Sequence, residues 1–272
     1  MTFTQSETRP FTMERGGTTL TAEIRPGQGT PILVVPGVMA DAATWRSVVA
    51  AIDLPNPVVT INRRGRSPSG GLGADYSVRV EIDDLRRTID SLGAVHLVGW
   101  SYGALIALET AIGCAAVRSL TAYEPVGAPF APDAVDVIRA ATAVGDLDRA
   151  VELVNTAVSG FSEDYVAELR RTPAWPVLRQ LAEPLGEELA AINDYRPSWK
   201  DYARLQIPVT LILGARNENL APYGTAFAPF AAALAHSRVA RLPEQGHLAH
   251  VEAPAELAAA IATAVGQAEG DG

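Results

Sequence analysis

The sequence has very little cysteine, little charge and no uninterrupted apolar segment long enough to cross a membrane. Its one cysteine, Cys114, excludes an intrachain disulfide, and we expect a partly buried, unreactive thiol there. Charged residues make up 19% and hydrophobic residues 48% of the 272 residues, which excludes an intrinsically disordered chain. Charges or prolines interrupt every long apolar stretch, whereas a spanning helix needs roughly 20 apolar residues in a row. We therefore expect a large buried core and no membrane partner.

Positive charge and metal-binding patterns are scarce too. The net charge is -9, and an acidic surface repels phosphate backbones, so we expect no nucleic-acid partner. The histidines, cysteine and acidic residues show no metal-ligand spacing, and no G-x-G-x-x-G follows a predicted strand. We therefore expect neither a metal nor another cofactor. Residues 1–11 lack the apolar core of a secretory signal, so the expected location is cytoplasmic.

Strand and helix patterns alternate along most of the chain. Apolar runs bounded by turn residues predict strands buried on both faces of a parallel sheet, and spacings of three and four predict helices. The strands are expected at 20–24, 32–35, 58–61, 95–99, 119–123, 209–213 and 239–242. The helices are expected at 75–93, 104–112, 226–235 and 254–264. This alternation predicts an α/β fold with a mostly parallel central sheet flanked by helices; residues 1–10 are expected to be loose.

The stretch 132–199 departs from this alternation. It shows helical periodicity without a convincing strand, and several prolines divide it into short helices. We expect a helical insertion that covers the ends of the strands. The predicted organisation is therefore a core of residues 1–131 and 200–272 with a helical cap of residues 132–199.

A serine lies in a G-x-S-x-G pattern between a predicted strand and a predicted helix. The pattern reads Gly99-Trp100-Ser101-Tyr102-Gly103, and strand–turn–helix is the context that this motif requires. The glycines leave room for a sharp turn that presents the Ser101 hydroxyl. The Tyr102 N–H and the start of the helix face the point where negative charge develops. We predict that Ser101 is a nucleophile; the alternative is an ordinary turn serine.

From this motif and the order of elements, the sequence resembles the α/β-hydrolase family over residues 18 to 266. The resemblance implies the α/β-hydrolase fold, a helical cap inserted after the sixth strand, and a triad in the chain order serine, acid, histidine. His247 stands at the family's histidine position and would take the proton of the weakly nucleophilic serine. We expect His96 to be packed within a strand, His236 to be solvated, and His250 to have a capping or surface role.

The acid departs from the commoner pattern of the family. Many members have G-x-x-D after the strand equivalent to 209–213, but here Asn217 stands at that position. An asparagine can orient an imidazole but cannot stabilise its positive charge. We prefer Glu124, because the carboxyl ends of strands face the crevice of an open α/β sheet; Asn217 and Glu218 remain alternatives. This placement is similar to that of the zearalenone-type lactonases, which carry their acid at this strand end.

The second oxyanion donor is expected in the turn after 32–35. Pro36 has no N–H, so the donor by position is the Val38 N–H, together with that of Tyr102. The side chains predicted to line an apolar substrate pocket are Met39, Trp100, Phe161, Tyr165 and Trp175. A basic loop, Arg63, Arg64 and Arg66, is expected to form structural ion pairs and solvated charge rather than to bind a substrate anion.

These residues together predict a cofactor-free serine hydrolase acting on an uncharged, moderately hydrophobic ester or lactone. Ser101 attacks, His247 takes the proton, and Glu124 stabilises the imidazolium. A serine nucleophile argues against the epoxide hydrolase and haloalkane dehalogenase branches, which use aspartate there. Thioesters, diketones, acyl transfer or other biosynthetic chemistry, and a ligand-binding receptor on the same fold remain alternatives, because fold and triad do not fix the substrate. A homodimer is left open.

Overall fold

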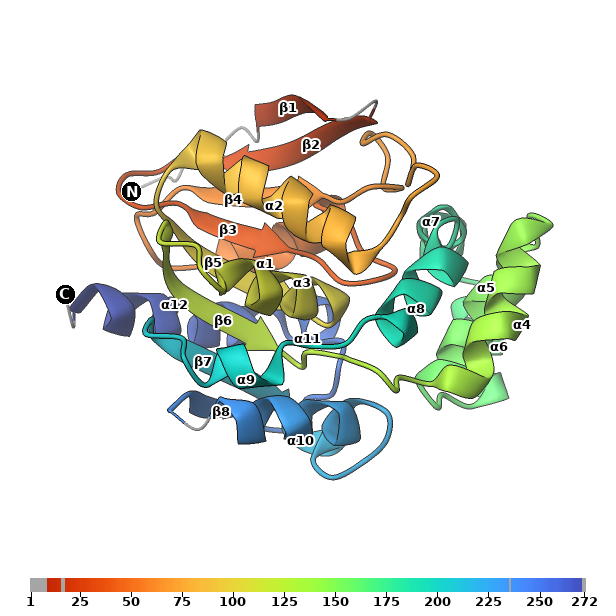
Figure 1. Ribbon diagram of the computed structural model, residues 1–272. Helices are drawn as coiled ribbons and strands as arrows, with labels where there is room; N and C mark the ends of the chain where they lie inside the picture. The colour runs from red at the N-terminus through yellow and green to blue at the C-terminus, as the bar shows by residue number, and fades with distance from the viewer. Residues whose placement is uncertain (1–8, 16–17, 235, 271–272) are drawn as a thin grey trace, which may run out of the picture.

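A mixed sheet organises the chain, and helices cover both of its faces (Figure 1). The computed structural model describes residues 9–15, 18–234 and 236–270. Over these residues the strands are β1 (Arg9–Arg15), β2 (Thr18–Arg25), β3 (Ile32–Val35), β4 (Val58–Asn62), β5 (Val95–Trp100), β6 (Val117–Tyr123), β7 (Val209–Gly214) and β8 (Arg238–Leu242). They form one eight-stranded sheet in the order β1-β2-β4-β3-β5-β6-β7-β8.

The strand directions match the mostly parallel sheet that the sequence predicts. β1 pairs with β2 and β2 with β4 in antiparallel register, and the remaining neighbours run parallel. The prediction of an α/β fold with a mostly parallel sheet is thus confirmed. The sequence missed β1: of the residues expected to be loose, 9 and 10 begin this strand, and 1–8 lie outside the described residues.

Each central strand buries alternate side chains on opposite faces of the sheet. The helices that follow or flank the strands are α1 (Arg46–Ala51), α2 (Val78–Leu92), α3 (Tyr102–Ala111), α9 (Trp199–Tyr202), α10 (Tyr223–Ala233), α11 (Ala249–Glu252) and α12 (Pro254–Gly270). Leu33 and Val35 of β3 join a core cluster with α2 and α3, whereas Ile32 and Val34 join a second cluster with α1 and α12. This two-sided burial explains the continuous apolar runs of the sequence.

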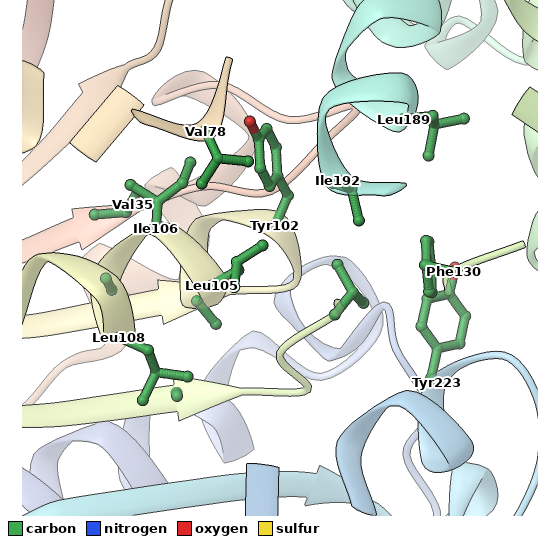
Figure 2. Close-up of a cluster of buried hydrophobic side chains, with 14 of the residues drawn as sticks. Val35, Val78, Tyr102, Leu105, Ile106, Leu108, Phe130, Leu189, Ile192 and Tyr223 are labelled. Carbon is green, nitrogen blue, oxygen red and sulfur yellow. The ribbon is translucent and has the colours of Figure 1, made fainter. Parts of the chain in front are cut away.

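Residues 132–199, called the helical insertion below, lie between β6 and β7 and are helical without a strand. The insertion contains α4 (Pro132–Ala143), α5 (Leu147–Leu153), the π-helix η2 (Val154–Val158), α6 (Glu163–Leu169), α7 (Ala174–Leu181) and α8 (Leu185–Asp194). Figure 1 shows these helices beyond the carboxyl end of β6, to one side of the sheet. Figure 2 shows Leu189 and Ile192 of α8 in the same buried cluster as Tyr102 of α3. The insertion therefore shares buried side chains with the sheet and its helices.

Neither a membrane-spanning helix nor a metal-binding cluster occurs in the described ranges. Among these residues, no helix combines the length and the apolar character needed to cross a bilayer. The same residues contain no group of three or more histidine, cysteine, aspartate or glutamate side chains placed to hold a metal ion.

Candidate active site

Ser101 lies in the sharp turn between β5 and α3. Its backbone has φ 56° and ψ -121°, a region that non-glycine residues rarely enter and that costs on the order of 1–3 kcal/mol. The flanking glycines make the turn sterically possible. A Cβ on Gly99 would lie 2.5 Å from the Ala104 Cα, and one on Gly103 would lie 2.1 Å from the Val35 carbonyl oxygen. The tight strand-to-helix turn that carries the serine therefore requires glycine at both flanking positions.

His247 is held by a buried carboxylate. Its Nδ1 lies 2.6 Å from Oε2 of Glu124, and the two residues are 8% and 0% exposed. Glu124 directly follows β6, so the strand end brings it to the histidine loop that follows β8. An Nδ1–H donated to this carboxylate leaves Nε2 as the ring nitrogen that can accept a proton. A carboxylate partner also stabilises the imidazolium that forms when it does.

Asn217, at the family's commoner acid position, contacts the same carboxylate. Its Nδ2 donates to Oε1 of Glu124 at 3.0 Å and to Oε2 at 2.9 Å, and the Gly214 N–H donates to Oε1 at 2.8 Å. Glu218 is turned elsewhere: it is partly exposed and pairs with Arg241 at 2.7 Å, a hydrogen bond that lowers the pKa of its carboxyl. Of the three candidate acids, the structure places Glu124 against His247 and makes Asn217 a partner of Glu124.

Aromatic side chains surround the histidine. The Tyr223 ring is stacked on the His247 ring, with 3.6 Å between centroids and 12° between planes. The Trp100 indole N–H donates to the His247 carbonyl oxygen at 3.0 Å, and the Tyr123 hydroxyl donates to the Gly246 carbonyl oxygen. Sequence reasoning did not identify Tyr223, because it follows β7 in a segment without a motif and approaches His247 only in the folded chain.

A second histidine lies beside the first. His250 is 3% exposed, and its ring centroid lies 4.1 Å from that of Trp100 and 5.6 Å from that of Trp45. The expectation of a capping or surface role for His250 is wrong, because the turn into α11 buries the ring between the two indoles. Burial, with a further contribution from His247, lowers the pKa of His250 to about 3. His250 is therefore a neutral side chain at ordinary pH.

The turn after β3 comes directly against the nucleophile. A Cβ on Gly37 would lie 2.8 Å from the Ser101 Cβ, so only glycine allows this approach. Val38, the next residue, lines the same cavity as Ser101, and Tyr102 begins α3 immediately after the nucleophile. The two predicted oxyanion donors, the N–H groups of Val38 and Tyr102, thus flank Ser101 from two separate elements.

A mostly apolar cavity of about 370 Å³ lies between the body of the protein and the helical insertion. Ser101 and His247 open onto it, and so do four of the side chains predicted to line a pocket: Met39, Trp100, Phe161 and Tyr165. Other walls come from the insertion and from α11. They include Val154, Val158, Leu178, Leu181 and Val251. A cavity of this size and character is typical of a site for a small organic ligand.

Trp175 is placed differently from the prediction. Among the described residues, those lining the cavity do not include it. Its ring is packed in the core, only 5% exposed, and its indole N–H donates to Asp148 at 2.6 Å. The prediction did not foresee that α7 turns Leu178 and Leu181, rather than Trp175, toward the site.

The basic loop forms ion pairs, as predicted, but they are buried. Arg63, Arg64 and Arg66 are 2%, 6% and 1% exposed, so the expected solvated charge is absent at these positions. Their carboxylate partners come from α2 and α8: Arg63 binds Glu81 and Glu188, Arg64 binds Asp84, and Arg66 binds Glu188. The loop thus connects the sheet to α2 and to the helical insertion.

Comparisons with known proteins agree with this architecture. A family model described as the alpha/beta hydrolase family matches residues 32–260. An alpha/beta hydrolase from Sphaerobacter thermophilus has 27% identity and a TM-score of 0.79 over 94% of this chain and 100% of that one. An enol-lactonase from Burkholderia xenovorans shares the fold, with 17% identity and a TM-score of 0.77 over 93% of this chain and 99% of that one.

One curated relative adds a partial sequence match. A candidate carbamate hydrolase, RutD of Azorhizobium caulinodans, is 32% identical over 98 residues, which are 35% of this chain and 37% of that protein. The matched part thus spans little more than a third of the relative. The family model covers most of the chain, and the chain belongs to the alpha/beta hydrolase family.

Proposed function

We propose that this protein is a serine hydrolase that cleaves an ester or lactone bond of a moderately hydrophobic small molecule. The observation that carries the proposal is the buried His247–Glu124 pair, with 2.6 Å between Nδ1 and Oε2, in which His247 opens with Ser101 onto one cavity. A nucleophile, a base and a group that orients the base are what activation of a serine hydroxyl requires.

The mechanism follows from these groups. Nε2 of His247 takes the Ser101 proton as Oγ attacks the substrate carbonyl carbon, and Glu124 stabilises the resulting imidazolium. The N–H groups of Val38 and Tyr102 hold the oxyanion of the tetrahedral intermediate. The imidazolium returns its proton to the leaving alkoxide, which departs as an alcohol or, from a lactone, stays attached as a hydroxyl. Water, deprotonated by His247, then releases the acid from Ser101.

The cavity limits the class of substrate. Its walls are largely aliphatic and aromatic, so a charged acyl group would lose hydration without a partner. Part of the wall comes from the helical insertion, which we propose acts as a cap that closes over the substrate and excludes water. An uncharged ester or lactone with apolar groups on the acyl side fits this chemistry.

Carbamates are a second candidate class, because the RutD relative, which matches this chain over 98 residues, is described as a candidate carbamate hydrolase. Carbamate cleavage passes through the same attack on a carbonyl carbon and needs the same oxyanion donors. Substrate tests therefore include alkyl carbamates beside esters and lactones of equal chain length.

The test combines covalent labelling with a substrate panel. A fluorophosphonate probe should modify Ser101, identified by peptide mapping, and Ser101→Ala should lose both the label and turnover. Ser91→Ala, a change at the end of α2 away from the cavity, is the matched control and should keep both. Turnover retained by Ser101→Ala, or a label on another residue of the wild type, would contradict the proposal.

A further inference from the structure

We propose that Arg63, anchored by Glu188 of the helical insertion, is a positioning residue for both oxyanion donors. The inference rests on the proposed serine hydrolase function and extends it, because it assigns a role to a buried ion pair outside the triad. It also links the position of the insertion to the geometry at Ser101.

Arg63 bonds the backbone of the oxyanion turn. Its Nε donates to the Pro36 carbonyl oxygen at 2.8 Å, and its Nη2 donates to the Gly37 carbonyl oxygen at 2.8 Å. The residue is 2% exposed. A planar guanidinium that donates to two successive carbonyls holds the peptide planes of the turn in one orientation.

The Gly37 carbonyl belongs to the same peptide unit as the Val38 N–H. In a planar trans peptide the C=O and N–H bonds point in opposite directions. Arg63 therefore turns the Val38 N–H away from itself when it holds the Gly37 oxygen. Rotation of this peptide unit would break the Arg63 hydrogen bond and withdraw the proposed donor together.

The same guanidinium contacts the residue that carries the other donor. The Arg63 Cζ lies 4.9 Å from the centroid of the Tyr102 ring, which is 0% exposed. A cation over an aromatic face is attractive, and more so when both groups are desolvated. The Tyr76 hydroxyl links Tyr102 to Glu81, because it lies 3.2 Å from the Tyr102 hydroxyl and 2.8 Å from Oε1 of Glu81. Arg63 thus contacts the Tyr102 ring and the peptide unit that carries the Val38 N–H.

Glu188 connects this arrangement to the insertion. It is 0% exposed on α8, and its Oε1 accepts from Arg63 Nη2 at 2.6 Å while its Oε2 accepts from Arg66 Nη2 at 2.5 Å. Glu81 of α2 holds the remaining side of the guanidinium, with 2.7 Å between Nη1 and Oε1. Burial alone lowers the pKa of Arg63, but the carboxylates of Glu188 and Glu81 outweigh it and raise that pKa well above its usual value. The guanidinium is therefore charged and fixed on all sides.

Stability alone is a weak explanation for such a pair. Desolvation of buried charges offsets much of their attraction, and apolar side chains of similar volume often stabilise a core as well or better. What an ion pair adds is orientation. Here the oriented group is the turn that supplies the Val38 N–H, and the orienting carboxylate comes from the insertion over the cavity.

The neighbouring pair Arg64–Asp84 provides a matched control. It is also buried and also joins the basic loop to α2, but Arg64 donates to the Leu72 carbonyl oxygen, whereas Arg63 donates to the oxyanion turn. Glu188→Gln and Asp84→Asn both replace a buried arginine partner by a neutral amide. A purely structural role predicts similar effects of the two changes on activity.

The experiment measures kcat, KM and inhibition by an alkyl boronic acid on active sites titrated with a fluorophosphonate, using the p-nitrophenyl ester that the wild type cleaves fastest. Glu188→Gln should lower kcat by about 10- to 100-fold with little change in KM, since loss of a whole oxyanion donor costs about 10²–10³ in kcat. Boronate affinity should fall in parallel, because its tetrahedral adduct occupies the oxyanion hole. Asp84→Asn should keep kcat and boronate affinity even where its melting temperature falls.

Arg63→Lys is the second variant, because it keeps the charge but not the planar fork that bonds two carbonyls. It should lose at least as much kcat as Glu188→Gln, and it keeps the test available if Glu188→Gln does not fold. Wild-type kcat and boronate affinity in the variants that fold, or equal losses in Asp84→Asn, would overturn the inference. Retained turnover in Ser101→Ala would instead overturn the proposed function, so the two failures are distinguishable.

Discussion

The ends of β6 and β7 lie side by side in the sheet, and each is followed by a polar side chain near His247. The two side chains make different contacts. After β6, Glu124 supplies the charge that contacts the histidine. After β7, Asn217 supplies two N–H donations to that charge. Both ends open onto the same edge of the sheet, so we expect that a carboxylate at either end can serve the same histidine.

Removal of the charge after β6 has the largest expected effect. Glu124→Gln keeps the size and an oxygen acceptor but cannot stabilise the imidazolium, and we expect kcat to fall about 10⁴-fold. The measurement is kcat for the same p-nitrophenyl ester on active sites titrated with a fluorophosphonate. A kcat near that of the wild type would show that the charge after β6 is not part of the mechanism.

Moving the carboxylate from position 124, after β6, to position 217, after β7, tests whether the two strand ends are interchangeable. Asn217 already reaches 2.9 Å from the Glu124 oxygen that holds His247. The double variant Glu124→Gln with Asn217→Asp should therefore regain about 100-fold in kcat over Glu124→Gln, while staying below the wild type, because a carboxylate again stabilises the imidazolium. No gain over the single variant would break the comparison, since the end of β7 would then be unable to serve the histidine.

The buried His250 should contribute to the loss of stability at low pH independently of the Glu124–His247 pair. Burial holds the pKa of His250 at about 3 in the folded protein, whereas an unfolded histidine titrates near 6.5. Between these values the unfolded state binds the extra proton, so this group destabilises the fold as the pH falls, by roughly 3 kcal/mol at pH 4.5.

Urea unfolding at pH 7 and pH 4.5 measures the destabilisation that we attribute to His250. In His250→Phe an aromatic ring remains between Trp45 and Trp100, but the proton site is gone. The variant should therefore lose less stability than the wild type on acidification. Equal losses in the two proteins would show that His250 takes up its proton in the folded state.

We expect the smallest effects on kcat from changes at Asn217 and Glu218, the two residues of the turn after β7. Asn217→Ala removes the donations to Glu124, and we expect about a tenfold loss of kcat, the size of one hydrogen bond to a charged group. Glu218→Ala breaks an exposed pair with Arg241, and such pairs contribute little, so its kcat should stay within about twofold. Reversed effects of the two variants would place the orienting group at Glu218.

The sequence predicts local features of this molecule better than contacts between distant segments. The central strands were predictable because two-sided burial leaves continuous apolar runs, whereas β1 was missed. The place of Ser101 in a sharp turn was predictable because the glycines of the elbow leave a motif. Glu124 was predictable because it ends a strand. These features depend on a few consecutive residues and on the order of the elements.

Contacts between side chains far apart in the sequence left no such pattern. Tyr223 of α10 stacks on His247, His250 lies between Trp45 and Trp100, and Trp175 packs within the helical insertion against Asp148. Ser159 is one example. It follows the π-helix η2, and its hydroxyl lies 2.8 Å from the hydroxyl of Tyr223, the residue whose ring is stacked on His247. No spacing in the sequence encodes a contact between residues so far apart.

The imidazole proton between His247 and Glu124 offers the most direct test of the central claim, that Glu124 is the group that orients the catalytic base. A short N–H···O⁻ hydrogen bond deshields its proton, so proton NMR of the ¹⁵N-histidine-labelled protein should show a far-downfield Nδ1–H resonance assigned to His247. The account predicts that this resonance is kept in Glu218→Ala and shifts upfield in Glu124→Gln. An unchanged resonance in Glu124→Gln would contradict it.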